Sequence, residues 1–362
     1  MTTHYGMIGC GMMGHEHLKN IALLDDAAVS VVYEPNKSMK ESAQELVPDA
    51  TFVNSLDDLL AHDALDALVI TTPNFCHVQD LEAIAEKVTL PILVEKPLFT
   101  DPDDLSRIQA FKDSYGAPVW VAMEYRYMPP MQMFLDRVDA FTGGIKMFSV
   151  TEHRFPFLTK VKNWNRLNKY SGGTFVEKCC HFFDLMRLTV KSDPVRVMAT
   201  GGQAVNHLSE IYDGQACDIW DCGYVIVDFA NGARAMLELS MYTEGSEYQE
   251  MMHALGPKGK LEVKIPGPAR LWTGDKDAPP VPHLVESPRY PCNPKKIDVP
   301  IDPTILDAGD HNGSTYYQHV KFLDVIRGSG AVEVTLDDGI WAVRMGMAAQ
   351  ESAVTGQVIE LT

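Results

Sequence analysis

The sequence is short of positive charge. Lys and Arg total 31 against 49 Asp and Glu, which gives a formal net charge of −18. A surface this acidic repels nucleic-acid backbones and anionic lipid headgroups, so neither is an expected partner. No apolar run approaches the length of a membrane span, and the first residues lack a basic stretch followed by an apolar one. These absences predict a soluble, cytoplasmic protein.

Cysteine is sparse and shows no metal-ligand spacing. The seven cysteines are Cys10, Cys76, Cys179, Cys180, Cys217, Cys222 and Cys292. An odd number without zinc-ribbon spacing predicts reduced thiols, most of them buried. The run Cys179-Cys180-His181 does not change this, because three consecutive helical residues cannot all face one ion. We therefore expect no metal site, and the chain has no internal repeat or low-complexity segment.

The length and the strand pattern predict two domains. At 362 residues the chain exceeds what one hydrophobic core usually supports. From residue 4 to about residue 122, β-rich runs alternate with helical patterns, which is typical of a parallel sheet with crossover helices. The runs are HYGMIG, AVSVVYE, DALVITT, PILVEK and PVWVAM. They predict an α/β domain over residues 1–124, a doubly wound parallel sheet of the Rossmann type.

The pattern changes after Pro129 and Pro130. The later β-rich runs are IKMFSVTEHRF, PVRVMATGG, CDIWDCGYVIVDFA, ARAMLELSMY and EYQEMMHALG. They predict an α+β domain over residues 125–362 with a large, open, mostly antiparallel sheet. One face of such a sheet needs cover, so a homodimer or homotetramer is expected. Residues 266–310 hold ten of the 22 prolines and almost no periodicity, which predicts an irregular lid, rim or interface.

A glycine-rich turn follows the first predicted strand. It runs Gly9-Cys10-Gly11-Met12-Met13-Gly14, and the helix HEHLKNIALL is expected where it ends. The first glycine makes the tight turn, the second lets the backbone approach a pyrophosphate, and the third permits close helix packing. Glu34 stands twenty residues after Gly14, where a carboxylate accepts hydrogen bonds from an adenosine ribose. We predict that Gly9 to Gly14 and Glu34 bind a dinucleotide.

The identity of that dinucleotide depends on Glu34. Its carboxylate would repel a 2′-phosphate, which favours NAD over NADP as the cofactor. Lys37 lies close by in the sequence and offers partial compensation for a phosphate. NADP is therefore the less favoured alternative.

Two further polar loops follow predicted strands. At the end of the run DALVITT and in the loop after it lie Thr72, Pro73, Asn74 and His77. At the end of the run PILVEK lies the pair Glu95-Lys96. Ligands of open α/β sheets bind outside the carboxyl ends of the strands, so all six residues are predicted to contact the cofactor. The structural alternatives are an ordinary helix start at His77 and a surface ion pair at Glu95-Lys96.

These motifs, in this order, resemble those of the glucose-fructose oxidoreductase and inositol dehydrogenase family. The order is GxGxxG, TPNxxH, EKP, and then a glycine-rich segment with an acid and a histidine four apart, GGTFVEKCCHFFD at residues 172–184. The resemblance extends over essentially the whole chain. It implies a Rossmann domain followed by an open-faced sheet domain, NAD or NADP as cofactor, and sugars, anhydrosugars, cyclitols or related polyols as substrates.

The resemblance also implies roles for particular residues. Oxidising a secondary alcohol needs a proton acceptor beside the hydroxyl as well as a hydride acceptor. His181 matches the position of the general base, Glu177 the neighbouring acid, and Lys96 the lysine that holds the substrate oxygen. The two residues on the predicted helix, Glu177 and His181, are one turn apart and so project from the same face.

Further residues are placed by the resemblance in the same site. Arg126 and Trp164 correspond to positions near the nicotinamide, and Tyr127 and Asn165 to positions near the substrate. Lys178 either faces solvent or helps to bind the substrate or the cofactor. Domain packing is the alternative for the aromatic residues. The carboxylate of Asp184 is expected to orient the helix or His181.

The sequence departs from the family pattern at two positions. The family usually has aspartate at the place of Glu177 and glycine at the place of Cys179, which makes the role of Glu177 as a substrate ligand less secure. Two other functions are compatible with the same fold and cofactor site. One is cleavage of glycosides through transient oxidation of the sugar, and the other is non-catalytic sensing of the cofactor. The presence of both Lys96 and His181 speaks against the non-catalytic sensor.

Overall fold

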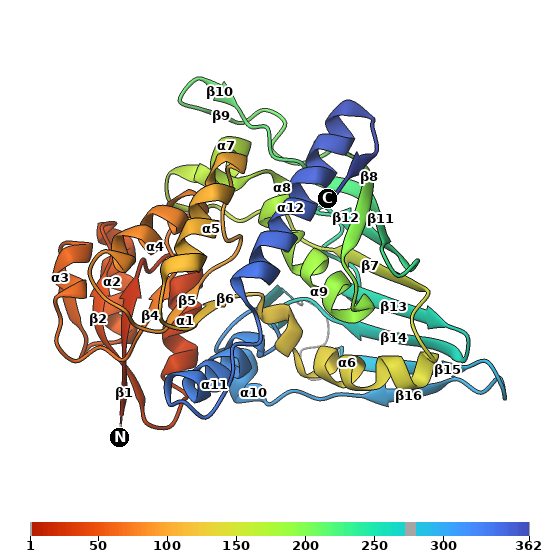
Figure 1. Cartoon of the computed structure of the whole chain (residues 1–362), viewed down its shortest axis with the longest axis horizontal. Helices are drawn as coiled ribbons and strands as arrows, with labels where there is room; N and C mark the ends of the chain where they lie inside the picture. Colours follow the sequence, from red (N-terminus) through yellow and green to blue (C-terminus); the bar gives the residue numbers. More distant parts are fainter. Residues whose placement is uncertain (1, 272–279, 362) are drawn as a thin grey trace.

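The computed structural model describes residues 2–271 and 280–361 and contains two sheets side by side (Figure 1). The first sheet has six strands in the order β3-β2-β1-β4-β5-β6, and all its pairings are parallel. The second has nine strands in the order β16-β15-β14-β13-β7-β12-β11-β8-β17. The predicted combination of a doubly wound parallel sheet and a large, mostly antiparallel sheet is confirmed.

The six-stranded sheet lies in the N-terminal third of the chain. Its strands are β1 (Thr3–Ile8), β2 (Ala27–Tyr33), β3 (Thr51–Val53), β4 (Ala67–Ile70), β5 (Ile92–Val94) and β6 (Val119–Val121). Its helices are α1 (Met12–Ile21), α2 (Lys37–Leu46), α3 (Leu56–Leu60), α4 (His77–Ala85) and α5 (Leu105–Ser114), with short 3₁₀ turns η1 (Asn74–Cys76) and η2 (Pro102–Asp104). Every residue of β4, β5 and β6 is buried, as expected of strands covered on both faces. The three-residue β3 was not among the runs found in the sequence.

The second sheet begins after a 3₁₀ turn, η3 (Glu124–Tyr127), and a helix, α6 (Pro129–Thr142). Its strands are β7 (Met147–His153), β8 (Pro194–Gly202), β11 (Cys222–Phe229), β12 (Arg234–Ser240), β13 (Glu250–Gly256), β14 (Gly259–Ile265), β15 (His283–Pro288), β16 (Lys295–Asp298) and β17 (Ile359–Glu360). The pair β12–β7 is parallel and the other pairs are antiparallel. A small hairpin, β9 (Ile211–Tyr212) with β10 (Gln215–Ala216), projects separately.

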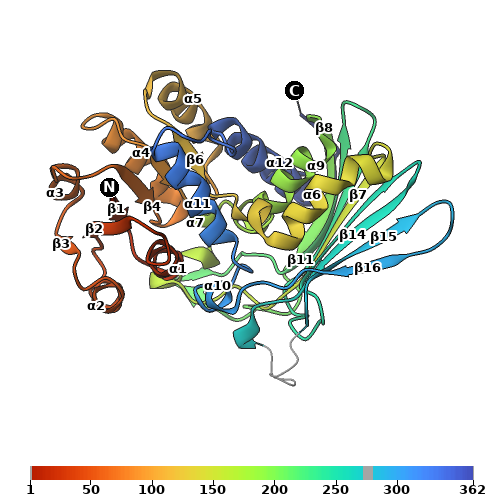
Figure 2. The ribbon, with the colours of Figure 1, turned by 90° about the horizontal axis from the view of Figure 1, so that it is seen from below.

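The remaining elements connect or cover this sheet. They are η4 (Val161–Arg166), α7 (Asn168–Ser171), α8 (Thr174–Glu177), α9 (Cys180–Val190), η5 (Ala269–Leu271), α10 (Pro303–Asp307), α11 (Ser314–Ile326) and α12 (Leu336–Thr355). Figure 2 shows α6, α9 and α12 on one face of the nine-stranded sheet. The opposite face exposes apolar side chains from three strands: Met147, Tyr224, Ile226 and Met236. Among the described residues, no helix covers that face.

The proline-rich segment is more regular than its sequence suggests. Residues 266–310 were expected to be irregular, but β15 and β16 pair antiparallel in this region and extend the sheet beyond β14. The described prolines of this segment lie outside β15 and β16, except for Pro288 at the last position of β15, so they leave the ladder intact and proline content was a poor guide here. Part of the segment, residues 272–279, lies outside the described residues.

The C-terminal helices return to the first sheet. Phe322 and Val325 of α11 and Ile340 and Val343 of α12 belong to the hydrophobic core of the N-terminal α/β unit. A Cβ added at Gly346 would lie 2.6 Å from the main-chain oxygen of Phe175, so this glycine lets α12 pack directly against α8. The two sheets are therefore joined through α12 as well as through the chain crossing at residues 124–128.

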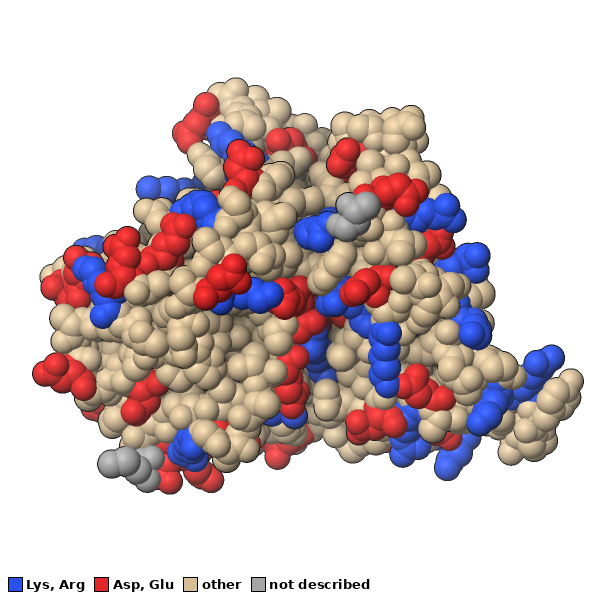
Figure 3. All heavy atoms as spheres, in the orientation of Figure 1, with Lys and Arg blue, Asp and Glu red and all other residues tan. Residues whose placement is uncertain are grey.

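The described surface matches the acidic composition. On the face shown in Figure 3, Asp and Glu are interspersed with Lys and Arg, without a continuous basic surface. No described helix is long and apolar enough to cross a membrane.

Candidate functional site

The glycine turn has the geometry that each glycine predicts. Gly9 has a φ of +82°, and a Cβ there would meet the main-chain nitrogen of Thr72 at 2.9 Å. A Cβ at Gly14 would meet Thr71 Oγ1 at 2.9 Å, whereas one at Gly11 would meet no described atom within 4 Å. The backbone at Gly11 is thus open to a ligand while its neighbours are packed. Helix α1 begins at Met12, three residues earlier than predicted, so Gly14 lies in its first turn.

Glu34 folds back onto this turn. Its Oε2 accepts a hydrogen bond from the Cys10 N–H at 2.6 Å, and its Oε1 accepts one from the Asn36 N–H at 2.7 Å. These bonds fix the carboxylate at the end of β2, next to the glycine turn. Each oxygen keeps a second lone pair, so the group can still accept hydrogen bonds from a ribose.

The loop after β4 is anchored from behind by His77. Its Nδ1 lies 2.8 Å from the Pro97 oxygen and its Nε2 lies 3.1 Å from the Thr72 oxygen, and the side chain is fully buried. Burial lowers the pKa of His77 despite these carbonyl contacts. His77 was predicted to contact the cofactor, but its imidazole instead ties together the loops after β4 and β5. Thr72 and Pro73 remain partly accessible on the front of the loop.

Glu95 also faces inward. Its Oε1 lies 2.9 Å from His17 Nε2, and His17 Nδ1 lies 2.7 Å from His319 Nε2, which links the end of β5 to α1 and α11. The carboxylate was predicted to contact the cofactor, but it is buried in this chain of side chains. The sequence offered no sign of the two histidine partners.

Lys96 points toward the second domain. Its Nζ donates a hydrogen bond to the main-chain oxygen of Glu177 at 3.1 Å. Burial would lower the pKa of Lys96, but the charges of Glu177, Glu95 and Glu124 outweigh it and raise the pKa above the usual value. Surrounded by carboxylates, Lys96 therefore stays protonated.

Glu177 links three parts of the chain. Its Oε2 accepts a hydrogen bond from the Asn74 amide, and its Oε1 lies 3.1 Å from Lys160 Nζ. Burial opposes ionisation, but Lys160, Lys96 and the Asn74 bond lower the pKa of the carboxyl. Both oxygens are thus already in use, which makes Glu177 a joint between domains before it is a substrate ligand.

His181 lies beside Glu177, but the two are not on one helix. The chain forms two short helices, α8 and α9, with Lys178 and Cys179 between them. The predicted single helical face is therefore corrected. Two cysteines precede His181. Cys180 packs into the hydrophobic core of the N-terminal α/β unit, and Cys179 packs into the core beneath the nine-stranded sheet.

Tyr125 and Glu124 surround the His181 ring. The Tyr125 ring stacks on the imidazole with centroids 4.1 Å apart and planes at 7°. Glu124 Oε1 lies 3.6 Å from His181 Nε2. Burial, and then the cations Lys96 and Lys178, hold the pKa of His181 well below 6.5. The imidazole is therefore neutral at neutral pH and able to accept a proton.

Lys178 extends this group of polar side chains. Its Nζ donates to the Tyr125 hydroxyl at 2.5 Å and lies 2.9 Å from Glu152 Oε1. Burial lowers the pKa of Lys178. Of the two sequence alternatives, exposure to solvent is excluded, because the side chain is buried.

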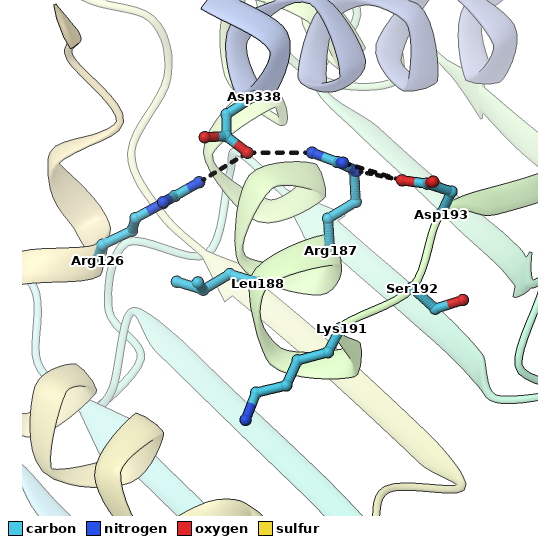
Figure 4. Close-up of a pocket in the computed structure, with 7 residues that line it drawn as sticks. All are labelled: Arg126, Arg187, Leu188, Lys191, Ser192, Asp193 and Asp338. Carbon is cyan, nitrogen blue, oxygen red and sulfur yellow. Dashed lines mark hydrogen bonds and ion pairs between the residues drawn. The ribbon is translucent and has the colours of Figure 1, made fainter. Parts of the chain in front are cut away.

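Two residues of the motif Tyr125-Arg126-Tyr127 lie elsewhere. Arg126 forms a two-pronged ion pair with Asp184, with its Nε 2.6 Å from Asp184 Oδ2, and donates to the Glu333 oxygen at 2.8 Å. Figure 4 shows its guanidinium near Asp338 of α12, in a pocket with Arg187 and Lys191. Tyr127 packs against Trp120 in the first core. Arg126 and Tyr127 thus hold the domains together, and Tyr125 takes the place in the site that was predicted for Tyr127.

The segment before α7 closes the front of the site. The Trp164 ring meets Phe75 of the loop after β4 edge-on, with centroids 6.1 Å apart, and Lys160 Nζ lies 4.5 Å above it. The contact of Trp164 with the cofactor stays a prediction. Asn165 is fully buried and donates to the Leu158 oxygen at 3.0 Å. Its predicted substrate contact is corrected: the side chain shapes its own loop.

Two family models match most of the chain. The model described as "Oxidoreductase family, NAD-binding Rossmann fold" matches residues 3–123, and the one described as "Oxidoreductase family, C-terminal alpha/beta domain" matches residues 142–361. The chain belongs to the glucose-fructose oxidoreductase and inositol dehydrogenase family. It is therefore an oxidoreductase with an NAD-binding fold.

Individual members of the family show how broad the likeness is. Inositol 2-dehydrogenase of Rhizobium meliloti is 26% identical over 76% of this chain and 80% of its own length. D-xylose 1-dehydrogenase (NADP(+)) 2 of Haloferax volcanii is 22% identical over 99% of both chains. The solved levoglucosan dehydrogenase, in complex with NADH and levoglucosan, is 18% identical and superposes with a TM-score of 0.81 over 99% of both chains. The structural likeness shows the shared fold.

Several polar residues of the site were missed by sequence reasoning. They are Glu16, Glu124, Glu152, Lys160 and Glu250, and all lie outside the family motifs. His311 also belongs to this group: its Nδ1 lies 2.8 Å from Glu16 Oε1, and although burial opposes ionisation, Glu16 raises the pKa of His311 to about 9. Glu152 and Glu250 face each other across β7 and β13 on the buried side of the sheet. For Glu152 the available signal was its place in β7, where it follows Phe148 and Val150 at alternate positions on the buried side of the strand.

The buried ion pair of Arg126 with Asp184 predicts that replacing Arg126 affects the stability of the fold and leaves cofactor binding nearly unchanged. Removing one partner of a buried ion pair leaves the other charge uncompensated and typically costs about 3 to 5 kcal/mol. Arg126→Ala should therefore lower the free energy of unfolding by about this amount while the Kd for NAD stays within about threefold. Chemical denaturation and cofactor titration measure the two effects. A variant of unchanged stability with much weaker NAD binding would restore Arg126 to the cofactor site.

Proposed function

We propose that this protein is an NAD-dependent dehydrogenase that oxidises a secondary hydroxyl of a sugar, anhydrosugar or cyclitol. The observation that carries the proposal is the meeting of a cationic lysine and a neutral histidine from different domains. Lys96, after β5, donates to the Glu177 oxygen, and its charge is among those that lower the pKa of His181 on α9, so the two side chains lie near each other. An acid-base pair of this kind suits an alcohol that must lose a proton while its carbon loses hydride.

The residues of the first domain fit a dinucleotide. The open backbone at Gly11 and the start of α1 suit a pyrophosphate, because both the amides and the helix dipole favour negative charge. Glu34 suits the ribose diol, and Thr72 and Pro73, together with Trp164 of the second domain, would lie at the nicotinamide end. When bound, the nicotinamide accepts the hydride from the alcohol carbon.

Lys96 is suited to hold the substrate oxygen. Its raised pKa keeps it an ammonium, so it can stabilise negative charge as the hydroxyl is deprotonated, but it cannot act as the base. The carboxylates around it offset the cost of burying that charge. Glu177 and Asn74 position this lysine by joining the loops on either side of it.

His181 is suited to take the proton. Its ring is neutral because burial and neighbouring cations disfavour the imidazolium, and stacking on Tyr125 fixes its plane. Its Nδ1 is buried and has no hydrogen-bond partner among the described residues. A buried polar atom in this state requires a partner, and a substrate hydroxyl would supply it.

A neutral, polyhydroxylated substrate fits the balance of charges. The cations Lys96, Lys160, Lys178 and His311 lie among the carboxylates of Glu124, Glu152, Glu177 and Glu250, so neither sign dominates. Relatives named inositol 2-dehydrogenase, D-xylose 1-dehydrogenase and levoglucosan dehydrogenase act on such molecules, which supports the same class here. Glycoside cleavage would use the same residues but would not accumulate NADH.

The catalytic proposal is tested by kinetics on a panel of sugars, anhydrosugars and cyclitols. Lys96→Ala and His181→Ala should each reduce kcat by about two to four powers of ten, the range for a positioned acid or base. NAD affinity should stay within a few-fold, and the double variant should be far less impaired than the product of both effects, because the residues act together. Wild-type turnover in His181→Ala would remove the histidine from the mechanism.

Cofactor preference is tested at Glu34. Because its carboxylate would bond the ribose and repel a 2′-phosphate, the wild-type protein should bind NAD more tightly than NADP. Glu34→Ala should narrow the ratio of the two Kd values by about tenfold or more, since a charged hydrogen bond is worth about 1.5 to 3 kcal/mol. Binding isotherms for both cofactors give the answer. A wild-type preference for NADP would overturn the assignment.

The uncovered sheet face supports self-association as a dimer or a dimer of dimers. Met147 is 55% exposed and Tyr224 53%, and the charged pair Lys260–Glu262 lies on the same face. A two-fold axis would bring this mixed surface against its own copy. Light scattering should give a dimer or tetramer at micromolar concentration, and Tyr224→Arg combined with Met236→Glu should shift it to monomer. A monomeric wild-type protein would contradict this.

A further inference from the structure

Glu124 is a buried carboxyl group without a hydrogen-bond partner. Its side chain is 1% exposed, and neither carboxylate oxygen bonds to any described residue. The Nε2 atom of His181 lies 3.6 Å from Glu124 Oε1, beyond hydrogen-bond distance. Burying a carboxyl group without a partner costs free energy, so a purely structural residue at this position would be expected to have one.

The turn that carries Glu124 also fixes the plane of the histidine. Glu124 and Tyr125 are consecutive in η3, and the Tyr125 ring lies flat on the His181 ring. One short turn therefore places a carboxyl at the edge of the imidazole and an aromatic ring on its face. The other ring nitrogen, Nδ1, has no partner among the described residues and remains for a ligand.

Four titratable groups surround Glu124: Glu95, Lys96, His311 and His181. Burial and the carboxylate of Glu95 raise its pKa to about 7, against the opposing influence of His311 and Lys96. The fourth group, His181, lies on α9. A carboxyl in this setting can exist in either protonation state near neutral pH, which is the condition for exchanging a proton with a neighbour.

We propose that Glu124 is the positioning residue and proton acceptor behind His181. The inference rests on the proposed dehydrogenase function. As the substrate hydroxyl gives its proton to Nδ1, the Nε2 proton moves to Glu124, so the imidazole is neutral before and after; this step requires the 3.6 Å between Nε2 and Oε1 to shorten to hydrogen-bond distance in the complex. The carboxylate becomes a carboxylic acid, the hydroxyl oxygen becomes the carbonyl oxygen of the product, and the hydride from its carbon reduces the nicotinamide. In the reverse direction the same protons return.

The kinetic test compares Glu124→Gln with Glu333→Gln. Glutamine keeps the size of the side chain but cannot take a proton, while Glu333 pairs with Lys321 on the surface and serves as the control. Because only the ionised carboxyl can accept a proton, kcat of the wild-type protein should rise with pH through about 7. Glu124→Gln should lose this rise and reduce kcat about a hundredfold, with KM within about threefold.

A second measurement does not depend on turnover. In ¹⁵N-histidine NMR spectra of the full chain with NAD, the His181 signals of the wild-type protein should report an Nε2–H tautomer that changes with pH near 7. In Glu124→Gln this titration should disappear, while the signals of His77 stay unchanged. Glu124→Asp should retain part of both the titration and the activity.

The possible outcomes separate this inference from the proposed function. If Glu124→Gln keeps the rise of kcat with pH and the pH-dependent His181 signals of the wild-type protein, the role of Glu124 is overturned, even if polyols are oxidised. If no polyol is oxidised, the proposed function fails, and the NMR titration still decides whether Glu124 and His181 exchange a proton. Loss of folding in Glu124→Gln, seen by thermal unfolding, would instead show that the carboxyl is structural and would also overturn the proposal.

Discussion

The hydrogen bonds of Glu177 join the two halves of the molecule, and the geometry of the site follows from them. The carboxylate accepts from Asn74 in the loop after β4 and from Lys160 in the segment before α7, while its main-chain oxygen accepts from Lys96 after β5. One residue at the end of a four-residue helix thus fixes both cofactor-side loops. If this joint were released, Lys96 would lose its described hydrogen bond to the second domain.

The site holds many buried charges within few residues, and they are balanced in pairs. Lys96 is stabilised by surrounding carboxylates, Lys178 by Glu152, and His311 by Glu16. Removing charges from water is costly unless they are paired, so this arrangement is maintained only because each cation faces an anion. Among the described residues of the site, both oxygens of Glu124, Glu250 Oε2 and His181 Nδ1 are buried without a hydrogen-bond partner, and of these Glu124 and His181 lie against each other. A polar ligand is the simplest means of completing their hydrogen bonding.

Sequence patterns sufficed for the fold and for the backbone-based part of the site. The glycine turn was predictable because Gly9, Gly11 and Gly14 each satisfy a local steric requirement, and the parallel strands were predictable because they are continuously apolar. Side-chain direction was not predictable to the same degree. Glu95, His77 and Arg126 stand in the right loops but face inward, since their partners His17, Pro97 and Asp184 come from distant parts of the chain. Glu124 was missed for the same reason, because its proposed role depends on contact with His181, which lies 57 residues away in the sequence.

The central claim is that a substrate hydroxyl binds between Lys96 and His181, beside the nicotinamide. A crystal structure of the protein with NADH and a polyol that it oxidises tests this claim most directly. The account predicts one ring hydroxyl within hydrogen-bond distance of both Lys96 Nζ and a His181 ring nitrogen, with its carbon facing the nicotinamide. A polyol bound with its reacting carbon away from both side chains would contradict it.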